Sequence, residues 1–329
     1  MSSTAPLVTI FGGSGFVGRY IAWRMARAGW RVRVAVRRPN EAGFVRAYGD
    51  VGQVEPIQAN VRDEPSTARA IEGADAVVNC VGILVQDAWQ KFDAVQAEAP
   101  GRIARLATAA GAERMLHVSA IGADAQSPAA YARTKAQGEA AVLEAFPAAV
   151  ILRPSIVFGA EDQFFNRFAA MARFSPAIPV VGAETRFQPV YVDDVAMAAE
   201  AALTGDARGI FELGGPDVET FRQLMVRMLG VIRRRRLVLT LPSGIAHIQA
   251  GALSLAQTLS LGLFTNTLIT RDQIRLLGRD NVVADGMPGL DALNVTPTAM
   301  DAVLESYLYA HRPHGQYTEI VEYSRDRRS

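Results

Sequence analysis

This chain of 329 residues has little cysteine, little histidine and almost no net charge. Its single cysteine, Cys80, excludes an intrachain disulfide and fits a reducing compartment. The net charge of +1 provides no overall field that would favour nucleic acid or acidic partners. The four histidines stand apart from cysteine and from acidic clusters, so we predict no metal site; they are His117, His247, His311 and His314.

The N-terminus also lacks the features of a secretory leader. The first nine residues contain neither a basic run nor a long apolar stretch, and they lead directly into a predicted strand. We therefore expect no signal peptide. What the chain has in quantity is apolar residues. They make up 50% of the sequence, which is enough for one large core, and the length indicates one or two domains.

The first recognisable unit is a strand, a glycine-rich turn and a helix. Leu7–Phe11 is a short apolar run rich in β-branched residues, typical of a buried parallel strand. A helical pattern follows the turn and ends near Gly29. Glycines at this spacing permit a tight turn, close approach of a pyrophosphate, and close packing of helix on strand. We predict a dinucleotide site at the turn, which consists of Gly12, Gly13, Ser14, Gly15, Phe16, Val17 and Gly18.

The second predicted strand, Arg31–Val36, ends at a basic pair, Arg37 and Arg38. In an NAD site an acidic residue stands at about this distance, roughly twenty residues past the glycines, and binds the ribose 2′-hydroxyl. Guanidinium groups instead match a 2′-phosphate in charge and geometry. The pair therefore favours NADPH over NADH. The alternative is that both arginines only solvate the end of a strand.

Strands and helices continue to alternate along the chain. Further strands are predicted at Val54–Ala59, Ala76–Val81 and Arg114–Ser119, and helices at Ser66–Ile71 and Phe92–Ala110. This order predicts an α/β fold with a Rossmann-type doubly wound parallel sheet. Because ligands bind beyond the carboxyl ends of such strands, we place these residues on the cofactor side: Asn60, Val61, Val81, Gly82 and Ser119.

A tyrosine and a lysine, Tyr131 and Lys135, form a Y-x-x-x-K motif with both side chains on one helical face. A tyrosine hydroxyl with a pKa near 10 needs a nearby cation to ionise at neutral pH, and Lys135 is one helical turn away. With the glycine turn and the strand ending at Ser119, the motif resembles the short-chain dehydrogenase/reductase superfamily, extended or atypical branch. The match covers most of residues 6–230 and includes Arg153–Gly159, Val190–Ala196 and Phe211–Pro216.

That resemblance implies roles for individual residues. The tyrosine would exchange a proton during hydride transfer, the lysine would hold the nicotinamide ribose, and Pro154 would contact the cofactor. On the superfamily's pattern the carbonyl-orienting serine or threonine falls on Ala120, whereas a shift of one residue places it on Ser119. Two interpretations remain open: a catalytic set of Tyr131, Lys135 and Ser119, or ribose binding by Tyr131 and Lys135 without turnover.

An ordered set of shorter segments carries a closer resemblance, to the NADPH-binding accessory subunits of respiratory complex I in a bacterial form. The family implies tightly held NADPH in a structural or regulatory role. It also implies docking on other complex I subunits of the peripheral quinone-reducing arm, at the cytoplasmic face of the inner membrane. The segments are Phe11–Gly18, Val81–Leu84, Phe92–Ala97, His117–Gly122 and Asp162–Arg167.

The character of the chain changes after residue 230. We predict an NAD(P)-binding domain at 1–230, with segments after about 155 contributing to a second lobe, and a C-terminal lobe at 231–329. Arg233–Arg236 is a run of arginines, and Leu237–Thr270 contains no charged residue. Within it, Gly244–Phe264 is long enough to cross a bilayer, but its glycines and polar residues favour a segment that lies on a surface or packs against a partner. Anionic lipid headgroups could meet the arginines. The alternative is an exposed strand edge followed by an ordinary buried helix of a substrate-type lobe.

Three functions are compatible with these patterns. The leading prediction is a complex I accessory subunit that holds NADPH without turnover. The alternative is an NADPH-dependent reductase or epimerase acting on a sugar-nucleotide or similar carbonyl substrate, for which the Y-x-x-x-K motif speaks. The third is a redox-sensing module, which requires unequal affinity for NADPH and NADP.

Overall fold

The central element is a seven-stranded parallel sheet in the computed structural model, which describes residues 5–86, 90–241 and 271–317. The strand order is β11-β6-β5-β4-β1-β2-β3. The predicted α/β fold with a doubly wound sheet is therefore confirmed. The strands are β1 (Leu7–Phe11), β2 (Arg31–Val36), β3 (Val54–Gln58), β4 (Ala76–Asn79), β5 (Arg114–Val118), β6 (Val150–Pro154) and β11 (Gly209–Leu213).

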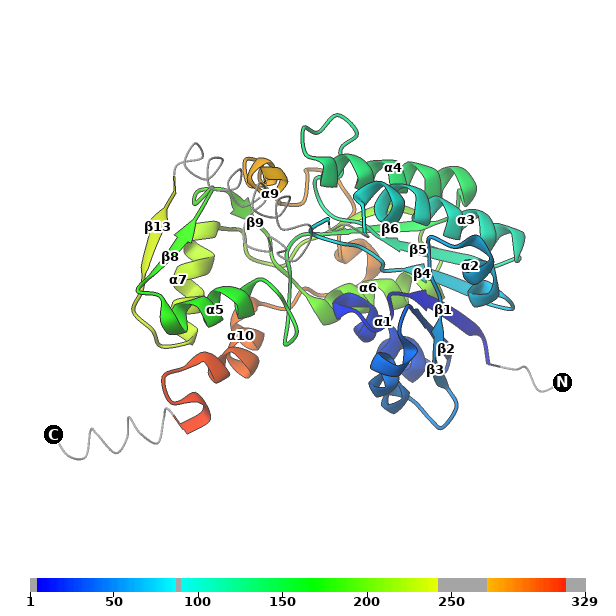
Figure 1. Ribbon diagram of the computed structural model, residues 1–329, viewed down its shortest axis with the longest axis horizontal. Coiled ribbons are helices and arrows are strands. Elements are labelled where there is room, and N and C mark those ends of the chain that lie inside the picture. The colour runs from blue at the N-terminus through cyan, green and yellow to red at the C-terminus, as the bar shows by residue number, and fades with distance from the viewer. Residues whose placement is uncertain (1–4, 87–89, 242–270, 318–329) are drawn as a thin grey trace, which may run out of the picture.

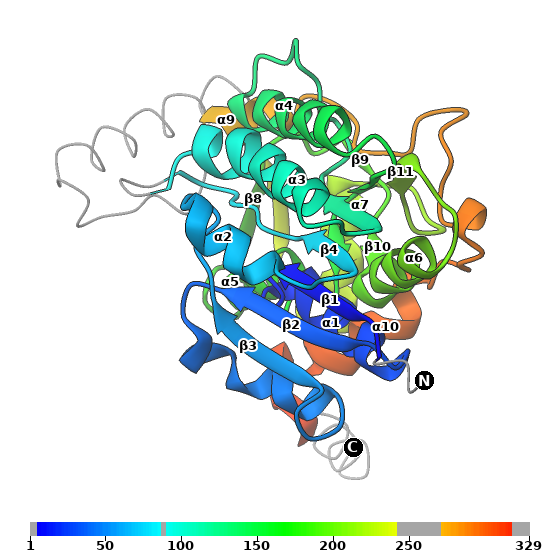
Figure 2. The ribbon, with the colours of Figure 1, turned by 90° about the vertical axis from the view of Figure 1, so that its right-hand side faces the viewer.

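Helices cover both faces of this sheet (Figure 2). One face carries α1 (Phe16–Arg27) and α6 (Val192–Thr204), and the other carries α2 (Glu64–Ile71), α3 (Ala99–Ala109) and α4 (Ala130–Ala145). Side chains alternate between the faces along a strand. In β1, Val8 and Ile10 belong to the core beneath α1 and α6, whereas Leu7 and Phe11 belong to the core beneath the other helices. Because both faces are buried, the central strands β1 and β4 are buried along their whole length and are largely apolar.

A second lobe stands beside the sheet (Figure 1). Its core is separate and is built around Phe158, Phe165 and Phe221. Its helices are α5 (Phe165–Phe174), α7 (Phe221–Val231), α9 (Arg271–Leu276) and α10 (Met300–Leu308). Short strand pairs accompany them: β7 (Val157–Phe158) with β10 (Val190–Tyr191), β8 (Ala177–Val180) with β13 (Leu237–Thr240), and β9 (Arg186–Phe187) with β12 (Glu219–Thr220). The residue at which the two predicted domains divide stays a prediction.

Several element boundaries differ from the sequence-based predictions for local reasons. The predicted helix Phe92–Ala110 is instead a π-helical turn, η2 (Asp93–Glu98), followed by α3. Pro100 explains the wider turn, because it has no N–H to bond to the carbonyl four residues earlier. The helix expected at Ser66–Ile71 begins two residues earlier, because the Asp63 carboxylate accepts a hydrogen bond from the Ser66 N–H at 2.9 Å.

The short 3₁₀ helices lie mostly near the C-terminal end of the described chain. η1 (Pro39–Tyr48) follows β2 and packs against α1. The others are η3 (Asp291–Leu293), η4 (Tyr309–His311) and η5 (Gly315–Tyr317). The predicted surface or partner-packed segment Gly244–Phe264 lies outside the described residues. Within the described ranges, no helix has the length and apolar character needed to span a membrane. The same ranges hold no cluster of His, Cys, Asp and Glu side chains suited to a metal ion.

Candidate functional site

The glycine turn between β1 and α1 is as compact as its spacing predicts. Gly12 has a φ of +75°, and its carbonyl accepts a hydrogen bond from the Gly15 N–H at 2.9 Å. A Cβ placed on Gly18 would lie 2.3 Å from the Gly12 carbonyl oxygen, so the third glycine is required for α1 to approach the strand. No side chain caps the start of α1, and its first turn contains no acidic residue. Its free N–H groups therefore suit an anionic pyrophosphate.

A cavity of about 290 Å³ opens from this turn, across the carboxyl ends of β1, β4 and β5. Most of the residues lining it are among the predicted site residues: Gly12, Gly15, Phe16, Val17, Gly18, Gly82, Ser119, Tyr131 and Lys135. The remaining lining residues are not: Cys80, Ile83, Leu84 and Val118. Ile83 and Leu84 belong to Val81–Leu84, one of the segments that carry the resemblance, whereas the signal for Cys80 and Val118 is their position next to a predicted residue at a strand end.

Lys135 projects from α4 into the buried end of the cavity. Its Nζ donates a hydrogen bond to the Val118 carbonyl at 3.2 Å. Burial lowers the pKa of this ammonium to about 8, against the opposing charges of Glu139 and Cys80. The ammonium is therefore held at the end of β5 and, at neutral pH, is only moderately more stable than the neutral amine.

Tyr131 lies one helical turn before Lys135 and packs edge-on against Phe92, with ring centroids 5.8 Å apart. Burial raises the pKa of the Tyr131 hydroxyl to about 12. Because burial disfavours the tyrosinate, the neutral phenol is strongly preferred at physiological pH. The site thus offers a protonated hydroxyl to any ligand that enters.

Ser119 supplies a second hydroxyl to the cavity, whereas Ala120 does not line it. The Ser119 backbone N–H donates to the Leu152 carbonyl at 2.7 Å, but its Oγ is buried without a hydrogen-bond partner among the described residues. Buried hydroxyls are rarely left unpaired. An orphaned Oγ inside a cavity is therefore suited to a hydrogen bond with a ligand.

His117 supports this wall from below. Its Nδ1 lies 3.1 Å from the Asn79 side-chain nitrogen, and burial together with Lys135 lowers the imidazole pKa to about 3. A histidine with this pKa is neutral at physiological pH and takes no part in proton transfer there. We therefore assign His117 a structural role under the strand ends.

Arg37 and Arg38 lie outside the cavity, at the exposed end of β2. Arg38 forms an ion pair with Glu41 at 3.1 Å. Arg37 makes no ion pair or hydrogen bond with the described part of the chain, so its guanidinium is available to a ligand beside the glycine turn.

The other predicted residues also lie outside the cavity, and their backbone groups hold the surrounding turns. The Ser14 carbonyl accepts from Arg19 at 3.1 Å, and the Val61 carbonyl accepts from Arg102 at 2.8 Å. The Asn60 N–H donates to the Ser66 hydroxyl, and the Val81 N–H donates to the Asn79 side chain. The Pro154 carbonyl accepts from the Ile121 N–H, and Gly13 lies close to Ile10 and Val34.

Three features of this arrangement fit a dinucleotide: a glycine cradle that a Cβ would fill, an uncapped helix N-terminus, and an orphaned Ser119 hydroxyl. A tyrosine and a lysine at the far end of the cavity complete the pattern of a nucleotide-dependent oxidoreductase or epimerase. The chain belongs to the NAD dependent epimerase/dehydratase family, whose model matches residues 8–214.

Among the relatives of the chain is NADH dehydrogenase (ubiquinone) 1 alpha subcomplex subunit 9 of Arabidopsis thaliana mitochondria. It is 33% identical over 95% of this chain and 80% of its own length. This similarity confirms the resemblance to the complex I accessory-subunit family. A ceramide reductase of Caulobacter vibrioides is 31% identical over 75% of this chain and 77% of its own length.

A solved structure shows the shared fold. The NADPH-dependent quinone oxidoreductase QOR2 of Escherichia coli, complexed with NADPH, superposes with a TM-score of 0.69 at 17% identity. The superposition covers 92% of this chain and 98% of that one. It therefore includes the second lobe as well as the sheet.

Proposed function

We propose that this chain is an accessory subunit of a proton-pumping NADH:ubiquinone oxidoreductase, complex I, and that it holds NADPH in a structural or regulatory role without turnover. The observation that carries the proposal is the 33% identity to a complex I subunit over 95% of the chain. A likeness limited to nucleotide binding would be concentrated around the glycine turn and the sheet. This one extends through the second lobe, where partner contacts and not nucleotide contacts would be shared.

The choice of NADPH rests on Arg37. Its exposed guanidinium stands at the end of β2 beside the glycine turn and has no partner among the described residues. A 2′-phosphate placed there would receive a charge-assisted hydrogen bond that a 2′-hydroxyl would not.

The absence of turnover is supported by the electrostatics of the tyrosine. Proton transfer by Tyr131 requires a hydroxyl whose pKa lies near the working pH. Burial instead raises it to about 12, with no opposing contribution from the Lys135 ammonium. The pair is therefore better suited to binding ribose hydroxyls than to moving a proton.

The proposed partners are other complex I subunits of the peripheral quinone-reducing arm, at the cytoplasmic face of a bacterial inner membrane. Anionic lipid headgroups are a further proposed contact of the arginine run. Arg234 and Arg236 donate to the carbonyls of His311 and Ala172, both at 2.8 Å, and so brace the second lobe. Arg235 is exposed, and the lipid proposal depends on it and on the segment after residue 241.

Purification of the tagged chain from its native membranes tests this function. We expect it to migrate with NADH:quinone reductase activity on native gels and to release about one NADPH per chain on denaturation, with no cofactor added. Recovery as a free protein without complex I subunits would overturn the assignment. A matched preparation with Gly18→Ala should lose the nucleotide, which shows that the released NADPH comes from this site.

A reductase or epimerase acting on a sugar-nucleotide or similar carbonyl is the second candidate. Tyr131, Lys135 and Ser119 line one cavity, and a ceramide reductase is among the relatives. Bound NADPH would supply the hydride. The Tyr131 hydroxyl would deliver a proton to the carbonyl oxygen, which the Ser119 hydroxyl would hold in place. Steady consumption of NADPH with any member of a broad carbonyl panel would favour a reductase, whereas an epimerase would interconvert sugar-nucleotide epimers without net consumption of the cofactor.

A further inference from the structure

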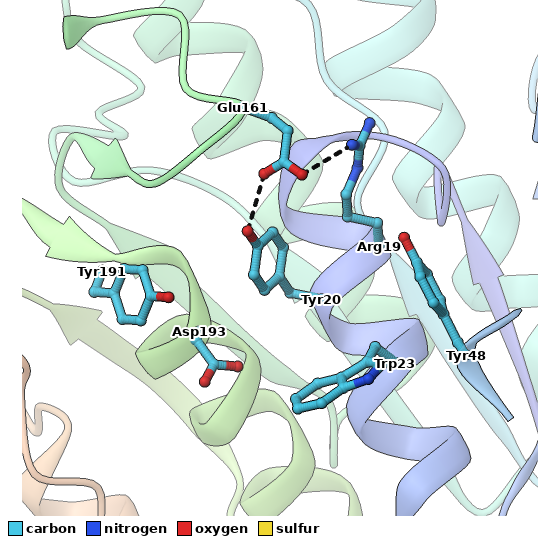
Figure 3. A pocket seen from close by; sticks show the side chains of 7 residues that line it. All are labelled: Arg19, Tyr20, Trp23, Tyr48, Glu161, Tyr191 and Asp193. Carbon is cyan, nitrogen blue, oxygen red and sulfur yellow. Dashed lines mark hydrogen bonds and ion pairs between the residues drawn. The ribbon is translucent and has the colours of Figure 1, made fainter. Parts of the chain in front are cut away.

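A second cavity, of about 340 Å³, lies on the outer side of α1 and shares no lining residue with the dinucleotide cavity (Figure 3). Aromatic side chains form most of it: Tyr20 and Trp23 from α1, Tyr48 from η1 and Tyr191 from β10. The charged members of its lining are Arg19, Glu161 and Asp193. A concave site of this volume suits a small organic group.

The two carboxylates of this cavity already accept hydrogen bonds from arginines: Arg19, which lines the cavity, and Arg24, which lies outside it. Glu161 accepts hydrogen bonds from Arg19 at 3.2 Å and from the Tyr20 hydroxyl at 2.9 Å. Asp193 accepts two from Arg24, both at 2.7 Å. The carboxylates therefore keep their negative charge, but their hydrogen-bonding positions are largely in use.

The local field favours a positive ligand on the side of Tyr20 and Tyr191. Burial raises the pKa of the Tyr191 hydroxyl, and the carboxylates of Asp193, Asp194 and Glu161 add to the rise more than Arg24 opposes it. The pKa of Tyr20 is raised by burial and by Glu161, with Arg19 opposing least. At Tyr48, Arg19 lowers the hydroxyl pKa by more than Glu161 raises it, although burial still raises the pKa as a whole.

Aromatic rings attract cations at this end of α1. The guanidinium of Arg27 lies 5.1 Å and that of Arg24 5.6 Å from the Trp23 ring centroid. Trp23 is therefore already engaged, whereas no cation is placed over Tyr20 or Tyr191 within the described chain. Figure 3 shows these two tyrosines from separate elements, with Glu161 above Tyr20 and Asp193 beside Tyr191.

We propose that this second cavity binds an organic cation whose charge is carried by an alkylated ammonium, such as a trimethylammonium group. Tyrosine faces attract such a group, and so does the excess of carboxylates over arginine around Tyr191. It brings no N–H donors, so it needs no free acceptor from carboxylates that are already engaged. A primary ammonium or a guanidinium would lose its hydration and would have to compete with Arg19 and Arg24 for acceptors.

Calorimetry on the full chain tests the proposal with tetramethylammonium and choline, compared with methylammonium and guanidinium. We expect the alkylated cations to bind and the two hydrogen-bonding cations to bind more weakly. Glu161→Gln, which keeps the shape of the wall, and Tyr191→Leu, which removes an aromatic face, should each weaken tetramethylammonium binding by about 3- to 30-fold. The matched controls are Glu144→Gln and Phe174→Leu, both at exposed positions outside the cavity lining, and these should leave the affinity unchanged.

Several outcomes would overturn this assignment: no binding of tetramethylammonium, equal or tighter binding of methylammonium, or an equal loss in the control variants. Thermal melting and retained NADPH binding show that each variant is folded. Binding to lipid vesicles shows whether the ammonium group belongs to a lipid or to a free solute. Sedimentation with phosphatidylcholine vesicles that is lost in Glu161→Gln supports a lipid headgroup. Binding of soluble choline without sedimentation supports a free solute.

Discussion

Asp272 of α9 holds the start of the helix that carries Tyr131. Its carboxylate accepts hydrogen bonds from the backbone N–H groups of Ala130, at 2.7 Å, and Tyr131, at 2.9 Å. The helix has Ala129 at its N-cap position and therefore has no side-chain cap of its own. A negative charge at a helix N-terminus is favoured by the peptide dipoles. The second lobe thus fixes the position of the tyrosine at the dinucleotide cavity.

Removal of this carboxylate should loosen the start of α4. We expect Asp272→Ala to lower the free energy of unfolding by about 1–2 kcal/mol, because two helix N–H groups lose their acceptor. Chemical denaturation measures the loss. Asp285→Ala, at an exposed position in the loop before η3, is the matched control and should change the value by less than about 0.5 kcal/mol. Equal effects of the two substitutions would show that the cap does not contribute.

The sequence was sufficient for the features that depend on local patterns. Short segments of the sequence are enough to predict the glycine turn, the alternation of β1 to β5 with helices, and the tyrosine–lysine spacing. The positions of these features in the fold then follow from the sheet topology. The cap on α4 was not predictable in this way. Asp272 lies 141 residues from Tyr131, and no periodicity links an acidic residue in one lobe to a helix start in another.

The pair Arg37 and Arg38 shows a second limit on what the sequence alone can predict. Both Arg37 and Arg38 fit a phosphate by residue type, but only the structure separates an unpartnered side chain from one held by an ion pair. Glu41, three residues after Arg38, was a usable signal for that pair. The choice between Ser119 and Ala120 also needed coordinates, because a shift of one residue along a strand end decides which side chain enters the cavity.

The close approach of Gly18 to Gly12 predicts a large effect for a single methyl group. A Cβ at Gly18 would meet the Gly12 carbonyl oxygen at 2.3 Å, which is backbone and cannot rotate away. We expect Gly18→Ala to lower the free energy of unfolding by about 1–3 kcal/mol. Gly230→Ala is the matched control, since its Cβ would meet nothing within 4 Å inside α7. It should stabilise the protein by about 0.5–1 kcal/mol. Thermal and urea melts measure both, and destabilisation by the control would contradict the steric argument.

Lys135 predicts a pH dependence of stability. Burial lowers its pKa from 10.5 to about 8, so below pH 8 the folded protein carries a costly buried charge. Between pH 8 and 10.5 the unfolded chain binds the proton more tightly, and stability must rise with pH. Relative to Lys135→Met, we expect the wild type to gain about 2 kcal/mol between pH 7 and 9.5.

The exposed Lys91 provides the control for this measurement. Lys91→Met should follow the wild-type profile at every pH, because an exposed ammonium is solvated in both states. Urea unfolding at a series of pH values gives the three curves. If the wild type and Lys135→Met run parallel, the ammonium is not desolvated in the folded protein and its assigned place in the cavity is wrong.

The hydroxyl of Tyr131 separates the two candidate functions. We expect Tyr131→Phe to bind NADPH within about threefold of the wild type, since one hydrogen bond to ribose contributes modestly. For an accessory subunit, neither protein should consume NADPH above background with a carbonyl panel. Consumption by the wild type that disappears in Tyr131→Phe would instead establish a working reductase. Fluorescence of the reduced nicotinamide reports binding, and the loss of this signal over time, as NADPH is oxidised, reports turnover.

Nucleotide selection should depend on Arg37 more than on Arg38. Arg37 is free of described partners, so a 2′-phosphate gains its full charge-assisted hydrogen bond. We expect Arg37→Ala to weaken NADPH by about tenfold, in keeping with the contribution of a charged hydrogen bond, and to leave NADH affinity within about twofold. Titration of both nucleotides by fluorescence measures the ratio.

Arg38→Ala is the matched substitution for this test, because it removes the same charge from the neighbouring position. Arg38 already pairs with Glu41 at 3.1 Å, so a phosphate would have to share its guanidinium with a carboxylate. The loss of NADPH affinity should therefore be smaller, about threefold. Should Arg37→Ala weaken NADPH and NADH equally, the side chain contacts something other than the 2′-phosphate. The preference for NADPH would then need another source within the site.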